Sequence, residues 1–218
     1  HPGEGQDVNR LELCQWTMEL AGIPTGSFLT TLNLTGEARR VVRWVDDALE
    51  QILQSHRWNF QWEQATVTIL AGTNATAGTI PASRYVRDSA YVGTRKMDDF
   101  VPWDVFRNAW ETPLIGNGEP SAWSIRPDMA FVVNSKPLAD LTITVQRYKN
   151  PAAMTADADV PPMPTEHHLA IVYKALLLYA NFEEAGVTRA VAEEELNRHL
   201  SAMAWNHLPP MLDAGPLC

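Results

Sequence analysis

The feature that most constrains this chain's fold is one wide apolar stripe on a predicted long helix. Between residues 36 and 57, apolar side chains recur every three or four positions, at Val41, Val42, Val45, Ala48, Leu49, Ile52 and Leu53. The opposite face is polar, with Arg39, Arg40, Arg43, Asp46, Asp47 and Glu50. A helix of that length, capped by Thr35, spans about 33 Å. Its stripe requires other helices to cover it.

Three further segments have helical periodicity. Residues 7–21, with Asp7 as the expected N-cap, form the first of them. Residues 166–184 and 188–207 form the other two, near the end of the chain. Two helices at each end can bury their apolar faces against one another, which favours a single bundle built from both ends.

The middle of the chain has strand periodicity instead. Residues 65–70 and 141–146 alternate apolar side chains with threonine or glutamine, as half-buried antiparallel strands do. The aromatic residues Trp58, Phe60 and Trp62 alternate in the same way, and we expect them to share one face of a strand. Shorter runs between glycines and prolines complete a β-rich region.

These patterns predict an α+β fold with an insertion. Residues 1–62 and 151–207 are expected to form a helical bundle of about four helices, two from each end of the chain. Residues 63–150 are expected to form an inserted antiparallel β-domain. The prolines and glycine of residues 208–218 predict an extended C-terminal arm.

Charge excludes one large class of protein. The chain has 218 residues, with 17 Lys and Arg against 26 Asp and Glu, and its formal charge of −9 excludes a strongly basic nucleic-acid binder. Segments 1–62, 63–150 and 151–218 carry −3, 0 and −6. The acidic excess therefore lies in the predicted helical ends.

Cysteine usage and hydropathy bear on location. The two cysteines form neither a disulfide framework nor a zinc knuckle, which fits a reducing compartment. The first residues lack the basic and apolar regions of a signal peptide, and no apolar run is long enough to cross a bilayer. We therefore expect synthesis in the cytoplasm and no membrane association.

Motifs that carry chemistry are few. Phosphate-loop, dinucleotide-binding, zinc-protease and nucleophile-elbow motifs are absent from the sequence. His167 and His168 follow Glu166, but neighbours on a helix point about 100° apart, so the two histidines cannot bind one ion.

Acidic motifs are equally weak candidates. The pairs Asp46-Asp47 and Asp98-Asp99 diverge for the same geometric reason. The segment 157–159 (DAD) lacks the glycine and the glutamate that complete a calcium loop. The sequence therefore predicts no catalytic residue, no metal and no cofactor.

The eight tryptophans leave alternatives open. Core filling accounts for some of them, and others could anchor protein–protein contacts, in which Trp, Tyr and Arg dominate the energetics. Trp44 is the leading candidate because it lies at the margin of the apolar stripe. An aromatic-rich carbohydrate-binding module is the first alternative function, and an unrecognised hydrolase is the second.

Two stretches of the chain resemble a family of tailed-bacteriophage head-to-tail adaptor proteins. The first is LTGEARRVVRWVDDA at 34–48, followed by Ile52 and the aromatic run RWNFQW at 57–62. The second is the alternating segment 141–148 with Pro151 after it, then DVPPMP at 159–164 before a long helix. The resemblance covers roughly residues 30–200.

The resemblance implies a structural protein of the virion's head–tail junction, without catalytic residues. Adaptors of this kind form a ring, usually of twelve copies, beneath the portal protein and extend the DNA channel toward the tail. The implied partners are the portal protein, identical subunits, a downstream tail or nozzle protein, and double-stranded DNA that passes without specific binding.

We expect two contact regions, an arm that the resemblance implies and a helix face that the position of Trp44 at the margin of the stripe suggests. The arm would lie on the portal or on a neighbouring subunit through Leu208, Pro209, Pro210, Met211, Leu212 and Leu217. One helix face would contact the next subunit through Arg40, Arg43, Trp44 and Asp47.

Overall fold

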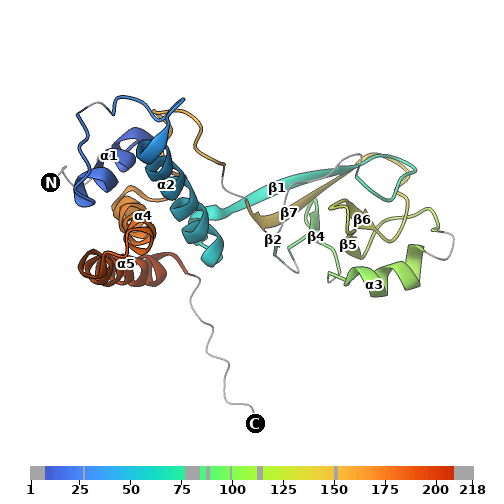
Figure 1. Ribbon diagram of the computed structural model, residues 1–218. Helices are drawn as coiled ribbons and strands as arrows, with labels where there is room; N and C mark the ends of the chain where they lie inside the picture. The colour runs from blue at the N-terminus through green and yellow to red at the C-terminus, as the bar shows by residue number, and fades with distance from the viewer. Residues whose placement is uncertain are drawn as a thin grey trace, which may run out of the picture. The chain divides into compact units, whose positions relative to one another are not determined.

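The computed structural model describes residues 8–26, 28–76, 84–86, 89–98, 100–111, 115–149 and 152–208. The fold is α+β, as predicted, with five α-helices and antiparallel sheets in this part of the chain (Figure 1). The chain divides into two compact units, residues 1–60 with 151–218 and residues 61–150. We call them the helical unit and the β unit.

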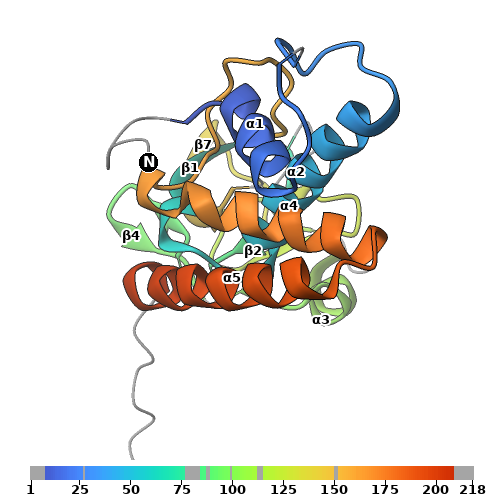
Figure 2. The ribbon, with the colours of Figure 1, turned by 60° about the vertical axis from the view of Figure 1, so that its left-hand side comes forward.

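The described part of the helical unit contains four α-helices. They are α1 (Arg10–Leu20), α2 (Gly36–Ser55), α4 (His168–Phe182) and α5 (Gly186–His207). Helix α4 contacts each of the other three and lies between α5 and the α1–α2 pair (Figure 2). None of the helices in the described residues is long and apolar enough to span a membrane.

Helix α2 buries the predicted stripe, because its buried residues are the seven apolar positions that the periodicity identified. Helix α4 is buried over a wider surface than a single stripe, including Ala170, Ile171 and Ala175, since helices pack on both sides of it. In α5, Ala192 is buried, whereas its neighbour Val191 is 53% exposed.

The N-terminus of α1 differs from the prediction. Its N-cap is Asn9, whose side chain accepts a hydrogen bond from the Glu12 N–H, while the Glu12 carboxylate accepts one from the Asn9 N–H, both at 3.0 Å. This reciprocal capping box satisfies two of the otherwise unpaired N–H groups of the first turn. Asp7, the predicted cap, lies outside the described residues.

The aromatic run does not form one strand, so that prediction is wrong. Trp58 is fully buried in the helical unit, and its indole N–H donates to the Ile52 carbonyl at 2.8 Å. Its ring stacks on Phe60 at 6.0 Å, and a 3₁₀ turn, Asn59–Gln61, follows. Only Trp62 enters a strand. Burial against α2 overrides the local alternation.

The β unit is organised around one long antiparallel ladder. Strands β1 (Trp62–Ile69) and β7 (Leu141–Tyr148) pair along their full lengths. The other edge of β7 pairs with β2 (Arg84–Tyr85) and β3 (Tyr91–Val92), and β4 pairs with β3. Strand β4 is Arg95–Lys96, and a separate pair consists of β5 (Trp123–Ile125) and β6 (Phe131–Val133).

The predicted alternation in β1 and β7 is confirmed by burial. Their inward side chains are at most 1% exposed, namely Val67, Ile69, Ile143 and Val145. They form one core with Trp123 and Phe131, whose rings stack at 5.0 Å. The β unit also contains a short helix, α3 (Trp103–Phe106), continued by a π-helical turn, Arg107–Glu111.

Candidate functional site

The predicted inter-subunit face on α2 makes two kinds of contact. Trp44 is half-buried, and its ring packs against Tyr179 and Phe182 of α4, with centroids 5.8 and 5.6 Å away. The guanidinium of Arg40 lies 4.8 Å from the centroid of the Phe182 ring, which is a cation–π contact. Arg40 and Trp44 therefore hold α2 to α4 within the chain.

The other two residues of this face are an exposed ion pair. Arg43 and Asp47 are 82% and 45% exposed, and their side chains lie 3.7 Å apart at i and i+4. Such a pair adds only about 0.3–0.5 kcal/mol to stability. Either side chain can therefore exchange its partner for a charge on a neighbouring molecule with little loss of stability.

Helix α5 exposes one large apolar side chain near each of its ends, and the predictions made from the sequence do not include them. Trp205 is 89% exposed, and Val187 is 84% exposed. They are eighteen residues apart, which is five helical turns, so they lie on one face. Leu196 and Met203 are buried on the opposite face. A helical wheel anchored on these two residues would have found Trp205.

The first residue of the predicted arm is the one that lies within the described residues. Leu208 caps α5, and its N–H donates to the Ala204 carbonyl at 3.1 Å. Its side chain packs, partly buried, against the helical core. The rest of the predicted arm lies outside the described residues, including Pro209, Pro210, Met211, Leu212 and Leu217.

A buried side chain, Arg10, joins four parts of the helical unit. It is 7% exposed and donates from Nε and Nη2 to the carboxylate of Asp46 in α2, at 3.0 and 2.5 Å. Its Nη1 donates to the Thr31 hydroxyl and to the Thr155 carbonyl, at 3.0 and 3.2 Å. Asp46 therefore faces Arg10 while Asp47 faces outward, which confirms that these adjacent acids diverge.

The acids of the 157–159 segment belong to the same polar network. Asp157 accepts hydrogen bonds from the Thr31 N–H and the Thr30 hydroxyl, each at 2.7 Å. Asp159 accepts from two successive backbone N–H groups, beginning with that of Thr155 at 2.6 Å. Donation from the hydroxyl of Thr31 lowers the pKa of Asp157, and the two backbone donors lower the pKa of Asp159. Both carboxylates serve as acceptors within the fold.

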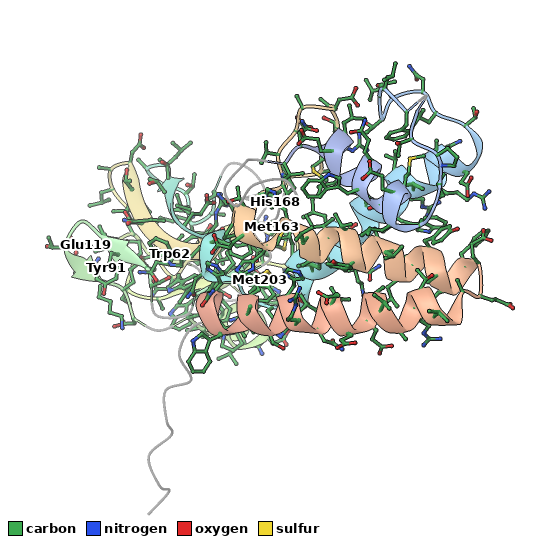
Figure 3. The ribbon with its side chains drawn as sticks, turned by 90° about the vertical axis from the view of Figure 1, so that its left-hand side faces the viewer. Trp62, Tyr91, Glu119, Met163, His168 and Met203 are labelled. Atoms are coloured by element: carbon green, nitrogen blue, oxygen red, sulfur yellow. The ribbon has the colours of Figure 1, made fainter. Side chains whose placement is uncertain are left out.

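His167 and His168 separate, as predicted, but His167 meets a third histidine. His168 is buried, and its Nε2 lies 3.2 Å from the carbonyl of Met163 (Figure 3). The His167 ring lies edge-on to that of His207 in α5, with centroids 5.1 Å apart. Oε1 of Glu166 is 3.8 Å from His167 Nε2 and 3.7 Å from His207 Nε2. Burial, followed by the nearby His207, lowers the pKa of His167, which keeps this imidazole neutral at pH 7.

The β unit exposes leucines at the end of its long ladder. Leu70 follows β1 and is 46% exposed, while Leu138 precedes β7 and is 81% exposed. The two connections are joined by a hydrogen bond from the Gly72 N–H to the Pro137 carbonyl, at 2.8 Å. This end of the sheet is a candidate protein contact.

Exposed large apolar side chains occur on both the helical unit and the β unit, and such side chains are candidate contacts with other proteins. A model of the SU10 adaptor protein family matches residues 16–211. The chain therefore belongs to this family of phage head-to-tail adaptors, and the resemblance seen in the sequence is confirmed. A comparison with curated proteins gives no match.

Family membership states the general role of the chain. It is a structural component of a phage virion, and its partners are in general the portal and tail proteins of that phage. A structural family agrees with the prediction that the chain is not an enzyme.

Proposed function

We propose that twelve copies of this chain form a ring beneath the portal protein and extend the DNA channel toward the tail. The observation that carries the proposal is that the helical unit has two different exposed faces, one on α2 with Arg43 and Asp47 and one on α5 with Trp205. A subunit of a closed ring needs two different surfaces, each complementary to the other. In this proposal the helices act as one bundle that faces the portal, and the β unit meets the next tail or nozzle protein.

The neighbour contact is assigned to two helical surfaces. One is the α2 face, where the exposed Arg43–Asp47 pair borders Arg40 and Trp44. The other is the exposed face of α5 with Trp205. A tryptophan that is open to solvent in the free subunit gains most from burial in a contact, because interface energies concentrate on such side chains.

The arm is assigned to the portal or to a neighbouring subunit. Its candidate contact residues are Leu208, Pro209, Pro210, Met211, Leu212 and Leu217.

Mixing the full-length chain with its portal protein tests the proposal directly. We expect negative-stain images to show a twelve-fold ring on the portal, and Trp205→Ala to weaken assembly about 30-fold or more, as loss of an interface hot spot does. Trp205→Phe, which keeps an aromatic ring, should retain most of the assembly. A chain that stays monomeric with the portal would refute the ring.

Deletion of residues 209–218 tests the role of the arm independently of ring formation. Leu208 and its cap on α5 remain in this variant. We expect portal binding to be lost while the helical unit keeps its circular dichroism spectrum. Portal binding at the wild-type level would refute the arm assignment.

The acidic charge has a role in this proposal. At −9 per chain, twelve copies carry −108, and a channel lined by part of that charge repels phosphate, so DNA slides without binding. Glu193 of α5 is the first to replace by lysine, because it is exposed and points about 120° away from Trp205 around the helix. We expect slower genome ejection from such virions, and glutamine at the same position should have a smaller effect. Unchanged ejection kinetics for lysine variants of the acidic helices would contradict this role.

A further inference from the structure

We propose that Glu166, His167 and His207 bind one divalent transition-metal ion, with zinc as the best fit to the donor set. Glu166 and His167 lie in a 3₁₀ turn, Thr165–His167, directly before α4, and His207 is the last residue of α5. One donor atom from each residue lies within 4.8 Å of the donor atoms of the other two. Two imidazoles and one carboxylate form a set of ligands that zinc uses in proteins.

The buried imidazoles carry the argument. The His167 side chain is only 4% exposed, and its Nε2 is shielded from solvent without a hydrogen-bond partner in the described residues. His207 Nε2 is likewise shielded from solvent and has no hydrogen-bond partner in the described residues. Buried polar atoms are normally paired, so two unpaired ring nitrogens beside one carboxylate require an explanation. A shared cation would satisfy both nitrogens and the carboxylate together.

Binding of an ion requires the donor atoms to move closer together. Tetrahedral zinc with bonds near 2.1 Å holds its donor atoms about 3.4 Å apart, whereas the three donor atoms here lie within 4.8 Å of one another. The two nitrogen-to-oxygen distances here are 3.8 and 3.7 Å. Glu166 is 61% exposed and can move closer without disturbing the core. Three protein ligands leave the fourth position to water, as in open zinc sites.

Packing already orients the second imidazole. The ring of His207 lies edge-on to Phe60 at 5.5 Å and edge-on to His167 at 5.1 Å. A bound ion would fix the last turn of α5 to the start of α4, directly before Leu208 and the residues that follow it. The proposal stands on this geometry alone and does not depend on the ring.

A metal titration of the full-length chain tests the site. The protein, without a polyhistidine tag, is stripped with a chelator and titrated with Zn²⁺ by calorimetry, and Co²⁺ is used as a spectroscopic probe. We expect one equivalent of ion, a higher thermal midpoint, and the visible absorption of four- or five-coordinate Co²⁺. Glu166→Gln and His207→Gln should each weaken binding by at least about tenfold, because each removes a ligand.

Two matched variants serve as controls. His199→Gln removes another histidine of α5, one that stacks on Tyr173 and lies outside the cluster, and Glu183→Gln removes an exposed acid. Both should bind Zn²⁺ like the wild type. Glu166 is exposed, so its glutamine variant tests the site without a risk to folding. Absence of stoichiometric binding, or equal losses in the site variants and the controls, would overturn the proposal.

Discussion

Replacement of Arg10 by alanine is expected to lower the free energy of unfolding of the helical unit by about 3 kcal/mol. The guanidinium is buried and donates to the Asp46 carboxylate, the Thr31 hydroxyl and the Thr155 carbonyl. Alanine leaves these acceptors without their donor, and a partly buried carboxylate that has lost its partner is unfavourable. Denaturant unfolding followed by far-ultraviolet circular dichroism measures the loss.

Arg43→Ala is the matched control for this variant. Arg43 also pairs with an aspartate of α2, but its side chain is 82% exposed. Its removal should change the unfolding free energy by no more than about 0.5 kcal/mol. The double variant Arg10→Met/Asp46→Leu should recover much of the stability lost in Arg10→Ala, since it leaves no charge unpaired. If Arg10→Ala and Arg43→Ala were equally mild, the ion pair would not be what ties these segments together.

Periodicity predicts the helices and strands that pack against the core on one face only. Helix α2 is packed on one face only, so its stripe could be identified residue by residue. The same holds for β1 and β7, where inward side chains alternate with outward ones. Helix α4 has neighbours on two sides, and its buried surface therefore exceeds any single stripe.

Local pattern failed where a distant contact determined the conformation. Trp58 and Phe60 alternate with Trp62 as in a strand, yet Trp58 caps the core beside α2 through its bond to Ile52. The strand begins only at Trp62. Nothing within five residues of Trp58 distinguishes these outcomes.

The candidate sites are harder to predict, because the residues of each site lie far apart in the sequence. Arg10 and Asp46 are 36 residues apart, and no spacing rule joins them. Helix geometry excludes an ion shared by His167 and His168, but it does not predict the neighbour of His167, because His207 comes from the end of another helix. Trp205 is different, because its place opposite Leu196 was available from helical periodicity.

Replacement of Trp58 by alanine is expected to be the most damaging single change in the core, with a loss of about 3–5 kcal/mol. The indole is fully buried and lies between the His56 ring at 4.9 Å and the Phe60 ring at 6.0 Å. Alanine removes these contacts, leaves a cavity and deprives the Ile52 carbonyl of its donor. The midpoint of denaturant unfolding should therefore shift to a lower denaturant concentration.

Two companion variants separate the causes of that loss. Trp58→Phe keeps an aromatic ring but removes the indole N–H, so it should lose less than the alanine variant and still fall below the wild type. Trp62→Ala, at a tryptophan that is 44% exposed, should cost less than about 1 kcal/mol. The two tryptophans come from one alternating run, and strand-like sharing of a face would make their alanine variants similar. Because Trp58 belongs to the helical core and Trp62 to the sheet, we expect a large difference in unfolding free energy between the two alanine variants.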